Sequence, residues 1–266
     1  MGTSASSKGP GSGVSFDPPW LGDIDVPGVP AETTMEKLVM PIMVAPPRRF
    51  ANARRYMGDY VRTGNGESAR KALGHYSKTG MGGAVNVARR MGTSTRSAVN
   101  YFNTFRSLRD NGTFSLSKEI RSLRERGADA QKVIDAIVRH IFPSGGSIDE
   151  TACRNSGASA LSDFLNKHKD ADVCNLSDDE IWSLTADFLG NEAFSRAMID
   201  MGQAMETQNL SPLDIVRRNN QMRRYIQSEI SAQINEMRKQ AEVEIDLNRF
   251  FQTVIKNTFE VFEVDI

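Results

Sequence analysis

The sequence predicts an all-α protein, a multi-helix body that carries a flexible Gly/Ser/Pro-rich N-terminal arm. Three observations favour this class. Apolar residues recur at three- and four-residue intervals in most segments beyond residue 48. No segment shows the alternation of apolar and polar residues that marks a half-buried strand. From Leu213 to Ile266 the chain contains neither glycine nor proline, the two residues that interrupt helices most often.

The arm is predicted to cover residues 1–30. It is rich in glycine, serine and proline, and its few apolar side chains do not offset the entropy cost of ordering it. Removal of Met1 would leave Gly2 as an unhindered primary amine with a pKa near ~8. Residues 9–13 would act as a spacer, and an aromatic and proline cluster as an extended anchor. We expect the arm to bind a partner through Gly2, Thr3, Ser4, Phe16, Pro18, Pro19, Trp20 and Leu21.

Two other interpretations of the arm stay open. Its composition also fits an ordinary terminal segment without a role of its own. Gly2 with Ser6 fits the pattern for N-myristoylation. One acyl chain anchors a protein only marginally, and Lys8 is the arm's single basic residue. We therefore expect no membrane association.

The region after the arm is expected to break into short helices separated by glycines. Residues 32–44 are predicted as a short helix or extended linker, interrupted by Pro41. Ser117 is the expected N-cap of a helix that ends at Gly127. The helices expected in this region cover residues 48–62, 67–78, 81–91, 94–110, 118–126 and 129–142.

The second half of the chain is expected to contain longer helices. They are predicted over residues 148–168, from Ser177 onward, over 192–207 and from Ser211 onward. The last segment should form a long helical hairpin, or one helix bent near residues 242–246. Its apolar stripe is predicted to be core, with an exposed partner surface as the alternative. The phenylalanines of this stripe are Phe250, Phe251, Phe259 and Phe262.

The expected domain organisation has three parts. They are the arm at 1–30, a basic helical region at 31–142, and an acidic-to-neutral helical region at 143–266. The boundary lies at Gly145 and Gly146, where a turn between two helices of one domain would look the same. A single domain over 31–266 is therefore the alternative.

The formal net charge of zero conceals a strong asymmetry. Residues 48–126 carry 17 lysines and arginines against 5 acidic residues, whereas residues 127–210 carry 6 against 14. Such blocks either pair within the molecule or face partners of opposite charge. Arginines interleaved with aromatic residues also suit contact with nucleic acid. The candidate arginines are Arg48, Arg49, Arg54, Arg55, Arg89, Arg90, Arg121 and Arg124, and the aromatics are Phe50, Tyr56, Tyr76, Tyr101 and Phe102.

Residues with catalytic or metal-binding chemistry are sparse. The three histidines, His75, His140 and His168, have no zinc-type spacing with one another or with a cysteine. Helix capping explains the acidic run at residues 178–180 better than cation binding does. A Cys153–His168 pair cannot be placed together from sequence. We therefore expect no enzyme activity, cofactor or metal. The absence of a signal peptide or a long apolar run predicts a cytoplasmic protein.

Three short stretches of the arm resemble a known family. They are Met1-Gly2-Thr3-Ser4, Gly9-Pro10-Gly11 and Pro18-Pro19-Trp20. Together they resemble the opening of the QatB family, the component without known catalytic motifs in the Qat anti-phage defence system of bacteria. The resemblance is strongest over about the first thirty residues and weaker over the rest.

The resemblance implies that the chain works within an assembly. Its implied partners are a QueC-like protein, an ATPase and a TatD-like nuclease. QueC enzymes use ATP to activate a carboxylate on a deazapurine and join it to ammonia, so a QueC-like partner needs an amine acceptor. We hypothesise that the Gly2 amine is this acceptor. The alternative function is a nucleic-acid-binding helical adaptor that uses residues 48–126.

Overall fold

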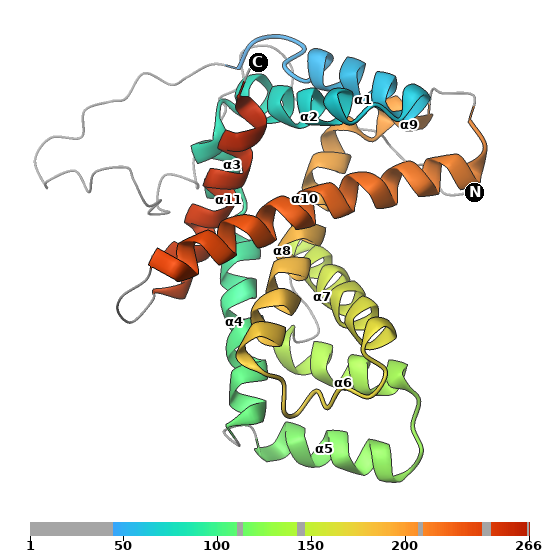
Figure 1. Cartoon of the computed structure of the whole chain (residues 1–266), viewed down its shortest axis with the longest axis vertical. Coiled ribbons are helices and arrows are strands. Elements are labelled where there is room, and N and C mark those ends of the chain that lie inside the picture. The colour runs from blue at the N-terminus through green and yellow to red at the C-terminus, as the bar shows by residue number, and fades with distance from the viewer. Residues whose placement is uncertain (1–44, 111–113, 143–146, 207–209, 241–245, 265) are drawn as a thin grey trace, which may run out of the picture. The chain divides into compact units, whose positions relative to one another are not determined.

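The computed structural model describes residues 45–110, 114–142, 147–206, 210–240, 246–264 and 266. Every regular element in these ranges is a helix, which confirms the predicted all-α class (Figure 1). The arm at residues 1–30 and the expected helix at 32–44 lie outside the described residues. So does the expected domain boundary near Gly145, and the division into domains therefore stays a prediction.

The described residues form two compact units built from interleaved segments. Unit 1 takes its described residues from Met1–Gly92, Phe194–Ile226 and Gln252–Ile266. Unit 2 takes them from Thr93–Ala193 and Gln227–Phe251. Each unit therefore combines an early part of the chain with segments from the C-terminal helices.

Unit 1 begins with α1 (Ala51–Thr63) and α2 (Gly66–His75), which pack against each other (Figure 1). The turn between them needs a left-handed residue, and Gly64 supplies it with φ 75°. The Asn65 side chain then caps α2 by accepting a hydrogen bond from the Glu67 N–H at 2.9 Å. Both features are local, and they fit the expected short helices separated by glycines.

The predicted α-helix over residues 67–78 is only partly correct. After α2 the chain continues as a π-helical turn, η2 (Tyr76–Met81), before α3 (Ala84–Arg90). In η2 the Phe50 ring lies against Gly80, where a β-carbon would come within 2.4 Å of it. This contact belongs to the tertiary structure, so helical periodicity alone does not reveal the wider turn.

Unit 2 contains most of α4 (Gly92–Arg109), together with α5 (Phe114–Glu125), α6 (Ala130–Ile141) and α7 (Ile148–Lys167). Helices α5, α6 and α7 pack in succession (Figure 1). The expected N-cap role of Ser117 is wrong, because α5 begins earlier and Ser117 is buried inside it. Gly127 does end this segment, with φ 68°.

The further segment expected over residues 192–207 does not begin a new helix. Helix α8 runs without a break from Asp178 to Met201, and the short α9 (Gln203–Glu206) follows it. Gly190 lies inside α8 at a close contact with Gln227 rather than at a helix end. From sequence alone, a glycine that permits close helix packing cannot be distinguished from a glycine that ends a helix.

The C-terminal region contains two helices, α10 (Pro212–Gln240) and α11 (Leu247–Glu263). Ser211 starts α10 as predicted, since its Oγ accepts a hydrogen bond from the Asp214 N–H at 3.1 Å. The Asp246 carboxylate caps α11 by accepting from the Asn248 N–H at 3.0 Å. Two helices, rather than one bent helix, therefore form this region.

The predicted phenylalanine stripe is core. Its four phenylalanines are all buried, and the exposed fraction of each is 6% or less. In unit 1 the Phe259 ring lies 6.0 Å from Tyr76 and 5.6 Å from Phe262, between ring centroids. In unit 2 the Phe251 ring lies 5.9 Å from that of Trp182. Burial of each such side chain stabilises the folded protein by about 1.5–3 kcal/mol.

Candidate functional site

The residues of the predicted partner-binding arm lie outside the described residues. They are Gly2, Thr3, Ser4, Phe16, Pro18, Pro19, Trp20 and Leu21. Their role in partner binding, and that of Gly2 as a modification site, therefore stay predictions.

The eight candidate arginines are divided between the two units. Arg121 and Arg124 lie on α5 in unit 2, and the other six lie in unit 1. The basic block of the sequence is therefore two separate groups, and each is described by itself.

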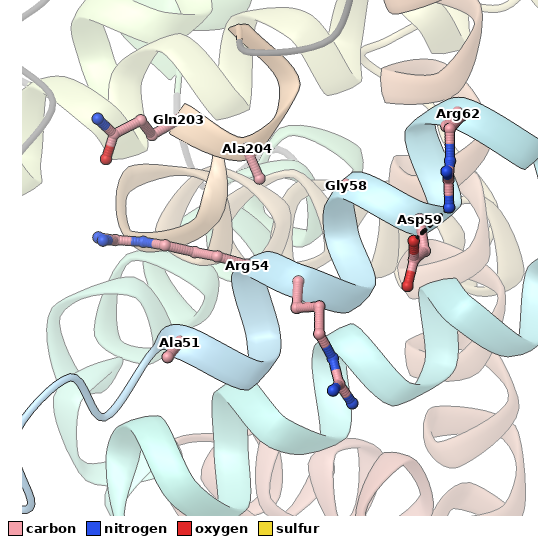
Figure 2. A pocket seen from close by; sticks show the side chains of 8 residues that line it. Ala51, Arg54, Gly58, Asp59, Arg62, Gln203 and Ala204 are labelled. Carbon is pink, nitrogen blue, oxygen red and sulfur yellow. Dashed lines mark hydrogen bonds and ion pairs between the residues drawn. The ribbon is translucent and has the colours of Figure 1, made fainter.

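Three arginines of α1 line a cavity of about 500 Å³ between α1 and α9. They are Arg54, Arg55 and Arg62. Figure 2 shows Arg54 and Arg62 extending from α1 in different directions, with Gln203 and Ala204 contributed by α9. Arg62 forms an ion pair with Asp59 at 2.7 Å, and the Arg54 Nε donates to the Asp200 carbonyl at 2.8 Å. The Asp59 carboxylate offsets the charge of Arg62, so the cavity wall carries both basic and acidic side chains.

Arg49 belongs to a buried group of charges in the same unit. It is only 7% exposed, and burial together with nearby Arg90 holds the pKa of its guanidinium below the ordinary value. Burial raises the pKa of the Asp200 carboxyl, and the positive charges of Arg49 and Arg90 partly oppose this shift. The pKa of the Tyr76 hydroxyl is also raised, mainly by burial. We read this group as an internal electrostatic cluster, and assign Arg49 no direct contact with a partner.

The other arginines of unit 1 differ in exposure, and Arg89 and Arg90 are half-buried. Arg48 is exposed, with left-handed backbone at φ 55°. Arg89 and Arg90 lie on the last turn of α3. The Arg89 guanidinium lies 3.4 Å from the Asn86 side-chain oxygen, and that of Arg90 lies 3.6 Å from the sulfur of Met81.

Most of the aromatic residues that the sequence places among these arginines are buried in the protein core. Phe50, Tyr76, Tyr101 and Phe102 are each 4% exposed or less. Tyr56 is the exception, because it is half-buried and carries charged neighbours. Its ring stacks on His75 at 5.2 Å between centroids, with 5° between the planes. The Arg55 guanidinium lies 4.5 Å from the centroid of the same ring.

Two further cations lie near this stack. The Lys71 Nζ is 5.9 Å from the Tyr56 centroid, and Lys78 follows three residues after His75. Burial lowers the pKa of His75, and Arg55, Lys78 and Lys71 lower it further. These effects disfavour the charged form of His75, whose ring lies beside the positive charges. The sequence gives little sign of this arrangement, apart from the i, i+4 spacing of Lys71 and His75.

The arginines of unit 2 partly neutralise the acidic block. Arg124 forms an ion pair with Asp172, and Arg109 forms one with Asp178, each at 2.6 Å. These pairs fit the expected internal pairing of the two charge blocks. Exposed pairs of this kind contribute about 0–1 kcal/mol each. Arg121 is exposed on α5.

Cys153 and His168, the possible nucleophile and base, both lie in unit 2. Cys153 lies inside α7 and His168 follows its last residue, so about 22 Å of helix separates them. The Glu192 carboxylate accepts hydrogen bonds from the Ser94 hydroxyl at 2.7 Å and the Cys153 thiol at 3.4 Å. Burial and Glu192 raise the pKa of Cys153 to about 12. This thiol is therefore a poor nucleophile, and these two residues cannot act as a nucleophile and base.

Among the described residues, no group of three or more His, Cys, Asp or Glu side chains is arranged to hold a metal ion. Within the same ranges, no helix has the length and apolar character needed to span a bilayer.

The described residues define an all-helical protein, with a group of cations around the Tyr56 ring in unit 1. A family model described as Qat anti-phage system associated protein QatB matches residues 82–262. The chain belongs to the QatB family, and it is accordingly a component of the Qat anti-phage defence system. The searches of curated proteins and of solved structures found no match.

The extent of the match adds to the resemblance described above. The arm carried that resemblance, whereas the family model matches the chain from just before α3 to the end of α11. Membership in the family is therefore established on the helical body. The arm, α1 and α2 lie outside the matched residues.

Proposed function

We propose that this chain is the non-catalytic, arm-bearing subunit of its defence system, and that it binds a QueC-like partner through residues 2–21. Membership in the QatB family carries this proposal, because it gives the chain a place in a multi-component system. The composition of the arm supports it. The arm combines a small first residue, a glycine-rich spacer and a Pro-Pro-Trp anchor within twenty residues.

The proposed modification is an amide bond at the Gly2 amine. The QueC-like partner would activate a deazapurine carboxylate with ATP, which forms an acyl-adenylate and releases pyrophosphate. The neutral amine would then attack the acyl carbon, the bond to AMP would break, and a proton would leave the nitrogen. An α-amino pKa near ~8 leaves a useful neutral fraction at physiological pH.

The described residues support a non-catalytic role for this chain. The buried Cys153 thiol has a raised pKa, and its only proposed base lies at the far end of α7. The activation chemistry would therefore belong to the partner, and this chain would supply the acceptor.

Intact mass spectrometry of the protein co-expressed with its QueC-like partner tests this function. We expect one adduct on the N-terminal peptide of the wild-type chain and of Gly2→Ala, which keeps a small residue after Met1. Gly2→Leu should lose the adduct, because leucine prevents removal of Met1 and the nitrogen of residue 2 then remains in a peptide bond. Lys8→Arg is the matched control, since it removes the other amine of the arm and should leave the adduct unchanged. Absence of an adduct on the wild-type chain, or an adduct on Lys8, would refute the modification.

A second candidate function is contact with single-stranded nucleic acid by unit 1. The observation that favours it is the Tyr56–His75 stack with Arg55 and Lys71 beside it. An aromatic surface bordered by cations suits a stacked base and its phosphate. This function does not depend on the arm, so binding should survive deletion of residues 2–20.

A further inference from the structure

Unit 1 contains another cavity, of about 480 Å³, to which the proposed function assigns no role. It is formed by residues of α1, α2 and α10, together with the Gly64 turn. Tyr60 and Met222 are buried in its wall, and Tyr225 is half-buried beside them. The polar residues of its lining include Glu67, Arg70 and Gln221.

Arg218 lies beside this cavity, next to two of its lining residues, Gly64 and Gln221. Its Nη1 donates a hydrogen bond to the Gln221 side-chain oxygen at 3.1 Å. Gly64 lines the cavity, and a β-carbon at this position would lie 2.2 Å from the nearest Arg218 guanidinium nitrogen. Arg218 is therefore packed directly over the turn, 6.0 Å from the Tyr60 ring centroid. The Tyr60 hydroxyl fixes this position by donating to the Arg218 carbonyl at 2.9 Å. The buried Nε of Arg218 makes no hydrogen bond within the described residues.

These features select one kind of occupant. Tyrosine-lined cavities bind proline rings and extended proline-rich segments, because the flat aromatic faces match the rigid backbone. The arginine beside the cavity favours a carboxylate near the prolines. The occupant should therefore be an extended peptide that contains prolines, an aromatic residue and an acidic residue.

The chain itself contains such a segment. Residues 16–21 read Phe-Asp-Pro-Pro-Trp-Leu, with Asp17 directly before the two prolines. We propose that this segment docks in the Tyr60–Tyr225 cavity of its own chain, with Asp17 at Arg218 and Pro18 and Pro19 against the half-buried Tyr225 ring.

The length of the intervening chain permits this docking. The 23 residues between Leu21 and Ala45 can span up to roughly 80 Å. An attached segment within reach is presented at an effective concentration on the order of a millimolar. A weak intrinsic affinity is therefore sufficient to occupy the cavity.

Docking would regulate the arm. This consequence rests on the proposed function, because the same residues are those we assign to partner binding. Partner and cavity would compete for residues 16–21, and docking would keep the arm unavailable until the partner is present. The docking itself is tested without the partner, so its failure leaves the proposed function untouched.

Site-specific crosslinking in the full-length chain tests the docking. A photoreactive benzoylphenylalanine replaces Trp20, and irradiated protein is digested and mapped by mass spectrometry. We expect intramolecular crosslinks to residues 219–226, with Met222 as a preferred acceptor, at a yield that does not change on dilution. Crosslinks confined to other segments would overturn the proposal. Crosslinks that disappear on dilution would also overturn it, because they would assign the cavity to a second copy.

Charge reversal supplies the matched control. Arg218→Glu should reduce the crosslink yield about tenfold, and adding Asp17→Arg should restore most of it. Lys167→Glu makes the same charge change on exposed α7 in unit 2 and should have no effect. Circular dichroism confirms that each variant is folded. A yield that Arg218→Glu leaves unchanged, or that Asp17→Arg does not restore, would refute the assigned contact.

Discussion

Gly190 of α8 packs directly against Gln227 of α10 within unit 2. A β-carbon at Gly190 would lie 2.4 Å from the Gln227 Cγ and 2.9 Å from its Cα. The Gln227 side chain also donates to the Asn191 side-chain oxygen at 3.2 Å. The two helices therefore approach each other at the one position where α8 has no side chain to separate them.

Gly190→Ala should destabilise the protein. Alanine normally stabilises a helix interior relative to glycine, but here the new methyl group would push on the backbone of α10. We expect a loss of roughly 1–3 kcal/mol, seen as a lower midpoint in thermal unfolding monitored by circular dichroism. Gly66→Ala is the matched control, because nothing lies within 4 Å of its β-carbon position. Equal midpoints for the two variants would contradict the close contact.

The two cysteines should differ in reactivity. Cys153 is fully buried with a pKa of about 12, whereas Cys174 is half-buried. Burial raises the pKa of both thiols, but only Cys174 stays partly accessible to solvent. Cys153 should therefore stay unlabelled by a thiol reagent at pH 8 while Cys174 reacts. Both should react in denaturant. Comparable rates for the two thiols in the folded protein would show that Cys153 is accessible.

The start of α8 should give a pH-dependent contribution to stability. Ser177 and Glu180 form a reciprocal cap, and hydrogen bonds from Ser177 hold the pKa of Glu180 below its ordinary value. A lowered carboxyl pKa means that this contribution is present above about pH 4.3 and is lost as the pH falls through the folded pKa. Glu180→Gln should therefore lower the urea midpoint at pH 7 and have a smaller effect at pH 3. The opposite order would refute the role of the ionised carboxylate.

Nucleic-acid binding should depend on the Tyr56 surface. In fluorescence anisotropy with a labelled single strand, Arg55→Glu combined with Lys71→Glu should weaken binding at least about tenfold and reduce the salt dependence. Lys167→Glu combined with Lys169→Glu makes the same charge change on exposed residues of unit 2 and should have little effect. If both double variants weaken binding equally, the interaction is non-specific and the surface has no special role.

Much of the fold could be predicted from sequence because its signals are local. Helix ends use residue types that suit them, such as the caps Asn65 and Ser211 and the C-terminal Gly127. The burial of the phenylalanine stripe follows from its regular spacing. The π turn after His75 and the role of Gly190 depend instead on contacts between segments distant in sequence.

The candidate surfaces also combine features that are local in sequence with features that depend on contacts between distant segments. Charge counting found the basic block, but it could not tell buried Arg49 from exposed Arg55. It also could not find the Tyr56–His75 stack or the Tyr60–Tyr225 cavity, because each joins residues from different helices. The role proposed for the arm could be predicted without a structure, because it is argued from residue types in the sequence and not from packing.

The most direct test of the central claim is a pull-down of the QueC-like partner by the full-length chain and by a version without residues 2–20. The intact mass of both proteins is read in the same experiment. We predict that the full-length chain retains the partner and carries an N-terminal adduct, and that the truncated chain, still helical by circular dichroism, shows neither. Retention of the partner by the truncated chain, with no adduct on either protein, would contradict the account and move the interaction to the helical units.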